Sequence, residues 1–207
     1  MGKEEIFSKL NIKDYTTLKQ AEADFTIVRL KELIDNDEFE LSSEYIKKIH
    51  YTLFQDVYRF AGKYRTIPIY KREKILAGLS VEYVKPKEIS NKLETIINFM
   101  KTIDFDKLNN EEKSLYLTDS LAQLWVVHPF REGNTRSIVT FIYKYMRSLN
   151  LKFDIDIFQY NMTYIRTALV AANFEDEIFE VKKNNTYLLK IINDAVNMGM
   201  EKKYERI

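Results

Sequence analysis

The sequence predicts an all-α protein with one small β-hairpin. Glycine and proline are scarce, with 5 and 3 copies, and apolar residues recur at helical spacing along most of the chain. Only residues 65–71 combine β-branched and aromatic side chains in the way that is typical of a strand. These observations favour a helical bundle with one short hairpin between its helices.

Composition sets broad limits on the class of protein. The chain has 207 residues, 45% of them hydrophobic, which is enough to bury a full core. Basic and acidic residues are mixed and the formal net charge is +1, so we expect no nucleic-acid binding. The absence of cysteine excludes disulfides and thiol catalysis. No signal-peptide core and no apolar run near the ~20 residues of a membrane span is present. We therefore expect a cytoplasmic protein without membrane association, folded as a single domain over residues 1–207.

The first two helices are indicated by caps and apolar stripes. The first is expected to follow Asp14 or Thr16, and the second to begin at the cap of residues 42–44 and to end near Gly62. The apolar face of the first helix is predicted to carry Leu18, Ala21, Phe25 and Val28. The apolar face of the second is predicted to carry Ile46, His50, Phe54 and Val57. In the strand-like stretch that follows, Pro68 argues against a central strand and favours an edge strand or short hairpin.

Helical spacing resumes after Pro86 and continues to the end of the chain. The third helix is marked by Ile89, Leu93, Ile96 and Met100. A fourth helix is expected to start at Asn110 and to end at His128, because Pro129 bars the residue before it from the helical conformation. A fifth is expected from about Asn134 to Asn150, and two or three more over roughly 157–200.

The loop between the fourth and fifth helices, residues 128–136, concentrates groups with distinct chemistry. His128 has an ordinary pKa near neutrality and is the natural proton acceptor, whereas Arg136 stays protonated and binds anions. Glu132 is the only carboxylate of the loop, and one carboxylate with phosphate oxygens and water is how Mg²⁺ is usually held. Gly133 allows close approach of the backbone to a phosphate, and Asn134 adds a side-chain amide beside the unpaired amides of a helix start. This pattern predicts a site for a metal-bound polyphosphate with a proton acceptor beside it.

Each of these residues also has an ordinary structural explanation. A histidine at a helix end is usually a cap, a Gly-Asn pair is usually a turn, and Glu132 with Arg136 could be an i,i+4 ion pair. Their coincidence within nine residues favours a functional site. We expect Phe130 to point into the core, and His50 to be a hydrogen-bonded core histidine rather than a second base.

Residues 128–136 resemble the motif of the Fic family, His-Pro-Phe-x-(Asp/Glu)-Gly-Asn-(Gly/Lys)-Arg, at eight of nine positions with x free, Thr135 being the departure. Residues 49–58 and 60–66 are similar to the helix and strand entry of Fic domains, and the resemblance covers roughly residues 20–195. It implies a Fic-fold helical bundle in which the hairpin is a flap.

The resemblance implies a protein adenylyltransferase, which transfers AMP from ATP to a Tyr, Thr or Ser hydroxyl of a target protein and releases pyrophosphate. In that scheme His128 takes the hydroxyl proton, and Glu132 holds Mg²⁺, which Mn²⁺ could replace. The residues assigned to ATP binding are Arg131, Gly133, Asn134, Thr135 and Arg136. The flap residues assigned to target docking by strand addition are Ile69, Tyr70 and Lys71.

Two departures from the family pattern affect regulation and chemistry. Many members carry a second arginine where this chain has Val139, and an inhibitory helix of the pattern (Ser/Thr)-x-x-x-Glu-(Gly/Asn) pairs with it. The nearest candidate, residues 186–190, ends in lysine instead of glutamate. We therefore expect that the chain lacks built-in inhibition of the usual kind, and that it is either restrained by a separate inhibitory, antitoxin-like protein or regulated differently. Thr135 matches neither usual residue, and its lack of charge favours AMP transfer. The alternatives are phosphoryl or other nucleotidyl transfer, or a non-catalytic nucleotide-binding module.

Overall fold

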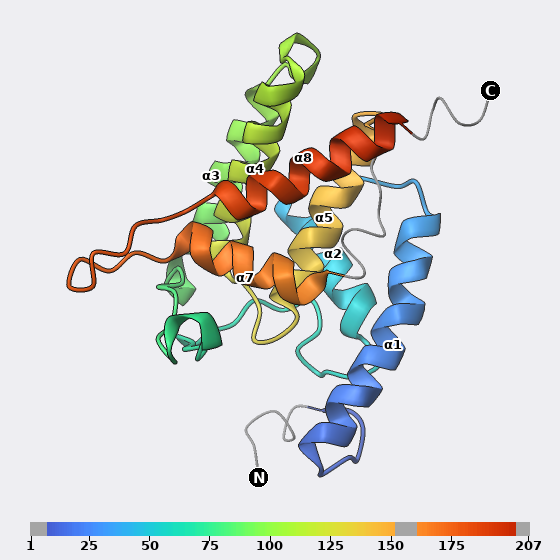
Figure 1. The fold of residues 1–207 in the computed structure, drawn as a ribbon. Helices are drawn as coiled ribbons and strands as arrows, with labels where there is room; N and C mark the ends of the chain where they lie inside the picture. Colours follow the sequence, from blue (N-terminus) through green and yellow to red (C-terminus); the bar gives the residue numbers. More distant parts are fainter. Residues whose placement is uncertain (1–7, 152–160, 202–207) are drawn as a thin grey trace.

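The computed structural model describes residues 8–151 and 161–201, and Figure 1 shows their arrangement. The helices are α1 (Tyr15–Asp35), α2 (Ser43–Phe54), α3 (Ile89–Thr102), α4 (Asn110–Val127), α5 (Asn134–Ser148), α7 (Met162–Asn173) and α8 (Thr186–Glu201). Short 3-10 turns are η2 (Lys74–Leu76), η3 (Pro86–Glu88) and η4 (Phe105–Lys107). Strand pairing in these residues is limited to two isolated bridges, Ser8 with Tyr58 and Asp176 with Val181. The predicted all-α class is therefore confirmed. Of the helices predicted over 157–200, the part before residue 161 lies outside the described residues.

Local sequence explains where most helices begin. Asp14 and Ser42 cap α1 and α2 by accepting a hydrogen bond from the backbone amide three residues on. Asn109 and Glu112 form a reciprocal capping box at the start of α4. The second helix ends at Phe54, earlier than predicted, and a series of turns leads to Gly62, whose φ is +73°. The predicted starts are confirmed and the predicted end of the second helix was wrong.

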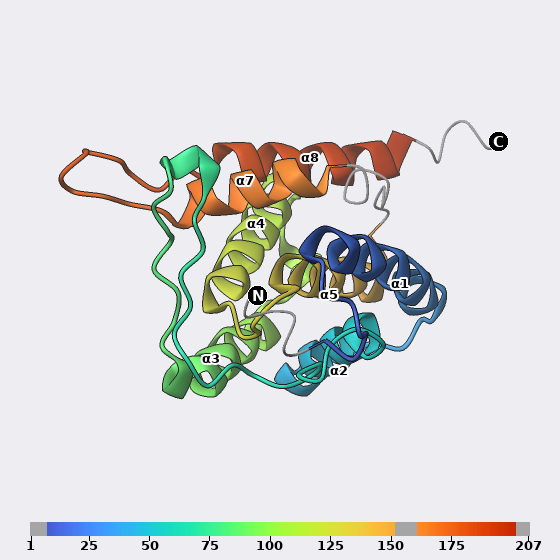
Figure 2. The same ribbon diagram turned by 90° about the horizontal axis from the view of Figure 1, so that it is seen from below.

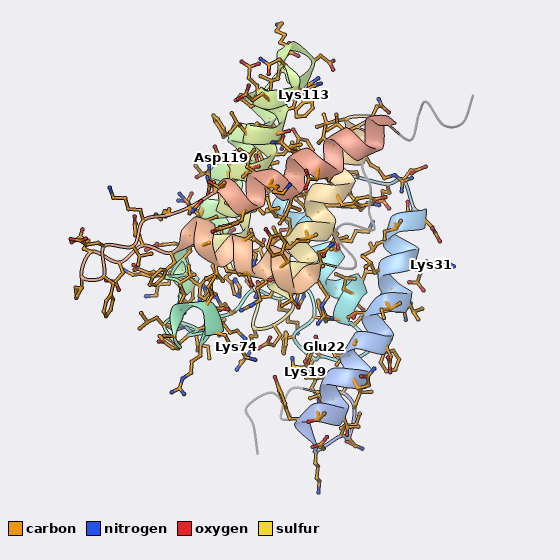
Figure 3. All side chains as sticks on the ribbon, viewed as in Figure 1. Lys19, Glu22, Lys31, Lys74, Lys113 and Asp119 are labelled. Atoms are coloured by element: carbon orange, nitrogen blue, oxygen red, sulfur yellow. The ribbon has the colours of Figure 1, made fainter. Side chains whose placement is uncertain are left out.

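The buried face of α1 differs from the predicted apolar face. The buried residues of this helix are Leu18, Glu22, Thr26 and Leu33. Phe25 and Val28, which the apolar pattern placed inside, are 40% and 60% exposed. The helix is rotated so that Glu22 faces Arg136 of α5 and the hydroxyl of Tyr58, and this polar pairing outweighs the burial of two apolar side chains. In Figure 3 Glu22 points from α1 toward the body of the molecule, whereas Lys31 points away from it.

Helix α5 lies at the centre of the bundle. It packs on α2 and α4, and α4 in turn contacts α3, α7 and α8. Figure 2 shows α5 enclosed by α1, α2, α4 and α7. Its side chains Ile138, Phe141 and Ile142 are fully buried, as is Trp125 of α4. This packing fixes the end of α4 against the start of α5, where the loop 128–136 lies.

Residues 65–84 form a long arm in place of the predicted β-hairpin. Figure 2 shows its two extended limbs running from the α3 side of the molecule to α7, where η2 joins them. The hairpin is not confirmed, because within the described residues 63–85 no strand ladder connects the limbs. Pro68 has no amide hydrogen to donate, and the amide of Lys71 donates to the side-chain hydroxyl of Ser80 (3.2 Å) instead of to a carbonyl.

In the described part of the chain, no helix combines the length and the apolar character that crossing a membrane requires.

Candidate active site

The loop between α4 and α5 is held in one conformation by its own residues. His128 is the C-cap of α4, which ends before Pro129 as predicted, and it adopts a left-handed conformation with φ of 48°. The Asn134 side chain then closes the loop, since it accepts from the Phe130 amide (2.8 Å) and donates to the Phe130 carbonyl (2.8 Å). Phe130 is fully buried, which confirms its predicted inward orientation. The loop is therefore preorganised.

A buried arginine of the arm, Arg65, also holds this loop. Its Nε donates to the His128 carbonyl (2.8 Å), its Nη2 donates to the Val127 carbonyl (3.4 Å), and its backbone amide donates to the Pro129 carbonyl (2.8 Å). These carbonyls belong to the C-terminal end of α4 and the residues after it, where a positive charge is favourable. Arg65 thus satisfies buried backbone acceptors and fixes the backbone of His128.

Glycine is required at position 133 for two reasons. Gly133 caps the start of α5 with φ of +77°, a conformation that other residues rarely adopt. A Cβ at this position would also lie 2.3 Å from Cε2 and Cζ of Phe54. The described residues provide no side-chain cap for this helix start, so its first amides remain available to an anion.

The orientation of the His128 ring leaves one nitrogen for chemistry. Nδ1 lies 3.3 Å from the Trp125 carbonyl, to which it can only donate, so Nε2 is the unprotonated nitrogen. The ring stacks on Tyr83, with centroids 4.0 Å apart. Burial, and after it the positive charges of Arg166 and Lys71, hold the pKa of His128 well below its ordinary value. The imidazole is therefore neutral at pH 7 and can accept a proton.

A cavity of about 220 Å³ opens beside this ring. The residues that line it are Lys19, Glu22, Lys71, His128, Glu132, Gly133, Asn134, Thr135, Arg136, Met162, Thr163 and Arg166. Four of them are cationic and two are carboxylates, so the cavity carries a net positive charge that suits a polyphosphate. The structure thus brings His128, Glu132 and the first turn of α5 together as the sequence predicted.

Arg136 is paired with a carboxylate that sequence reasoning missed. It forms an ion pair with Glu22 and donates to the Thr26 hydroxyl (2.8 Å). Burial alone would raise the pKa of Glu22, but the charges of Arg136 and Lys19 and a hydrogen bond from Tyr58 outweigh it and lower that pKa. Figure 3 shows Glu22 and Lys19 on the same part of α1. This pairing ties α1 to the start of α5 and orients Arg136 at the edge of the cavity.

Glu132, the predicted metal ligand, forms an ion pair with Lys71 of the arm. Among the described residues, no group of three or more His, Cys, Asp or Glu side chains is placed to hold a metal ion. A single carboxylate fits Mg²⁺ only when phosphate oxygens and water complete its octahedral shell. The donor set therefore fits a metal that arrives with a nucleotide, and Lys71 neutralises Glu132 in the protein alone.

The hydroxyl of Thr135 accepts hydrogen bonds from two donors. Its Oγ1 accepts from Trp125 Nε1 (3.0 Å) and lies 3.4 Å from Nη1 of Arg166, a residue of α7. Both lone pairs are then in use, so the hydroxyl hydrogen is the only hydrogen-bonding capacity that these two contacts leave to the Thr135 side chain. Neither partner was predicted: Trp125 lies on α4, ten residues before Thr135, and Arg166 lies on α7, 31 residues after it.

Of the other predicted site residues, Lys71 reaches the cavity, Ile69 packs on the core, and Tyr70 is 62% exposed with its hydroxyl on the Gly78 carbonyl (3.0 Å). Arg131 is half-buried and is absent from the described residues that line the cavity. Their roles stay predictions.

His50 is a core histidine, as predicted. Its Nδ1 accepts from the Gly62 amide (2.8 Å), so the ring nitrogen that donates is Nε2, and its acceptor is the Glu132 carbonyl (3.0 Å). The ring stacks on Phe130 with centroids 3.7 Å apart. Burial lowers the pKa of His50 to about 3, so the ring stays neutral and keeps its hydrogen bond to the loop backbone at Glu132.

The fold and the cavity together define a helical protein that places a neutral histidine beside a cationic, anion-accepting helix start. The sequence model of the Fic/DOC family matches residues 40–146. The chain belongs to the Fic/DOC family.

Relatives agree with this assignment. Over 155 residues the chain is 31% identical to the protein adenylyltransferase VbhT of Bartonella schoenbuchensis, covering 73% of this chain but only 30% of the length of VbhT. Its fold is similar to that of BepC from Bartonella tribocorum with bound AMPPNP, with a TM-score of 0.72, 18% identity and coverage of 91% and 90% of the two chains. The ADP-bound Fic domain of a Bep effector from Bartonella quintana also has a TM-score of 0.72, with 20% identity and coverage of 91% and 88%.

Proposed function

We propose that this protein is an adenylyltransferase that moves AMP from ATP to a Tyr, Thr or Ser hydroxyl of a target protein. The observation that carries the proposal is the neutral His128, whose Nε2 is unprotonated beside a cationic cavity at the start of α5. A base next to an anion site is what activation of a hydroxyl toward a phosphate requires. Similarity to VbhT, named a protein adenylyltransferase, favours AMP as the transferred group.

In this reaction the target hydroxyl gives its proton to Nε2 of His128 as its oxygen attacks the α-phosphorus. The new O–P bond forms while the bond from the α-phosphorus to the bridging oxygen breaks, and that oxygen leaves with the electron pair as part of pyrophosphate. The hydrogen bond to Trp125 and the stacking on Tyr83 keep the ring oriented for this transfer.

The start of α5 supplies the binding of phosphate. The amides after Gly133, the Thr135 hydroxyl and the Arg136 guanidinium face the same cavity, and donors of this kind are commonly worth ~3 kcal/mol each in the transition state. Asn134 contributes by fixing the loop, since its oxygen and one amide hydrogen are bound to Phe130. Glu132 would hold Mg²⁺, or Mn²⁺ in its place, which would offset the negative charge of the phosphates. Lys71 must then release Glu132.

The target and any inhibitor would be proteins. The extended limbs of the arm have backbone groups that no strand ladder uses within the described residues 63–85, which suits docking by strand addition near Ile69, Tyr70 and Lys71. The inhibitory pattern was not found in the sequence, which favours restraint by a separate antitoxin-like protein. One continuous apolar cluster from Leu18 to Val196 supports a single domain with a core over about 20–195.

The proposal is tested by incubating the protein and candidate targets with ATP labelled at the α- or the γ-phosphate. Wild type is expected to leave α-label on protein and no γ-label, and His128→Ala is expected to abolish labelling while ATP binding persists. Transfer of γ-label would favour phosphoryl transfer. Equal labelling by wild type and His128→Ala would refute the role of His128. ATP binding without any labelling would favour a nucleotide-binding module. Thermal denaturation of both proteins checks that the variant is folded.

A further inference from the structure

Arg166 of α7 lines the cavity, to which α1 contributes Lys19 and Glu22. It lies far from the loop in sequence, and its guanidinium reaches Thr135 with Nη1 at 3.4 Å from the hydroxyl. Its charge acts on the base, because it is the strongest influence on the pKa of His128 after burial. Arg166 therefore belongs to the electrostatic environment of the site although it lies outside the loop.

The position after the loop at which a second arginine was expected provides no charge. Val139 is 3% exposed and packs in the apolar core. The cations that line the cavity are Lys19, Lys71, Arg136 and Arg166. Three of these cations have a carboxylate partner: Lys19 and Arg136 pair with Glu22, and Lys71 pairs with Glu132. The two carboxylates, Glu22 and Glu132, also line the cavity.

Arg166 differs from these three cations in where its counter-charge lies. Its carboxylate partner is Glu73 of the arm, bound through Nε (3.3 Å) and Nη2. Among the described residues, Glu73 is not one that lines the cavity. One edge of the planar guanidinium thus faces Glu73, and Nη1 faces the cavity beside the Thr135 hydroxyl. A guanidinium held in this way can donate to a phosphate without leaving its carboxylate.

We propose that Arg166 is a nucleotide-binding residue that takes the β- and γ-phosphates of ATP, and so supplies from α7 the positive charge that position 139 lacks. The proposal rests on the proposed function for the identity of the nucleotide. Phosphates that reach the α7 side of the cavity meet Arg166 and the Thr135 hydroxyl together. Glu73 acts as the positioning residue that keeps the guanidinium at this place when no nucleotide is bound.

The test measures equilibrium binding of ATP and AMP by calorimetry, with Mg²⁺ present and no target protein. Arg166→Met is expected to weaken ATP binding about tenfold or more, as loss of charge-assisted hydrogen bonds to phosphate implies, and to change AMP binding less than about twofold. Arg166→Lys keeps a charge and is expected to recover part of the ATP affinity. The matched control is Arg147→Met, which removes an arginine paired with Asp37 elsewhere on the surface and should leave both affinities unchanged.

A purely structural role of Arg166 makes different predictions. If the residue only ties the arm to α7, then Glu73→Gln should weaken ATP binding as much as Arg166→Met does, and Arg166→Lys should recover nothing. Either result, or equal losses of ATP and AMP affinity in Arg166→Met, overturns the proposal. A loss of ATP affinity in Glu73→Gln that is clearly smaller than the loss in Arg166→Met supports it, because Arg166 keeps its charge in that variant. If Arg166→Met weakens ATP binding as expected but wild type labels no protein, the proposed function is refuted and this inference stands. If wild type labels protein but Arg166→Met binds ATP as tightly as wild type does, this inference is refuted and the proposed function stands.

Discussion

His50 gives the structure a pH dependence whose size can be worked out. Burial lowers its pKa from the ordinary 6.5 to about 3, and both ring nitrogens are bonded to backbone groups in the neutral form. Below pH 6.5 His50 binds a proton in the unfolded chain but stays neutral in the folded chain. The stabilisation linked to this group is therefore complete above pH 6.5 and is lost as the pH falls from 6.5 toward 3.

At about pH 5.5, one unit below the ordinary pKa, the loss from His50 is about 1.4 kcal/mol. We expect urea denaturation of wild type at about pH 7.5 and 5.5 to show this loss within the total change in the free energy of unfolding. In His50→Gln the loss over the same interval should be smaller by about 1.4 kcal/mol. Because each protein is compared with itself at the two pH values, the pH-independent cost of the substitution cancels. His128 contributes equally to the change in both proteins.

The control for this prediction is Phe141→Leu, which removes a buried ring of α5 that packs on Phe39 and leaves both histidines and the Phe130 ring on His50 in place. This variant should be less stable at both pH values, with the wild-type loss between them. If His50→Gln loses as much stability on acidification as wild type does, the neutral buried histidine described above is refuted.

Three further substitutions test the supports of the loop. Gly133→Ala should lower the free energy of unfolding by about 2–5 kcal/mol in urea denaturation, because it forces a positive φ on alanine and sets its Cβ against Phe54; wild-type stability would contradict this. Arg65→Met leaves the buried carbonyls at the end of α4 without a donor, so it should lower the free energy of unfolding by about 2 kcal/mol and speed hydrogen exchange of the loop amides. Unchanged exchange would show that Arg65 does not hold the loop. Glu22→Gln should lower the thermal midpoint through a loss of about 2 kcal/mol, since Arg136 loses its charged partner, and a midpoint equal to that of wild type would show that the pair contributes nothing.

Local patterns predicted the helices and the loop 128–136 because their causes are local. Caps such as Asp14 and Asn109, the block at Pro129 and the chemistry of His128 all act within a few residues. The predicted hairpin was not confirmed, since its composition indicated extended backbone but could not show where the amide of Lys71 would bond.

The missed residues act over long distances in the chain. Glu22 meets Arg136 across 114 residues, and Arg65 meets His128 across 63. No periodicity marks such pairs, and with Glu22 buried the inner face of α1 keeps Leu18 but leaves Phe25 and Val28 exposed. An acidic residue amid the predicted core stripe was the one available signal for Glu22.

The central claim is that His128 activates a protein hydroxyl for transfer of AMP. Mass spectrometry of lysate proteins treated with ATP and either wild type or His128→Ala tests it most directly. We expect adenylylated Tyr, Thr or Ser side chains in the wild-type sample and none above background with His128→Ala. Adenylylated sites at equal levels in both samples, or wild-type samples that carry phosphate in place of AMP, would contradict it.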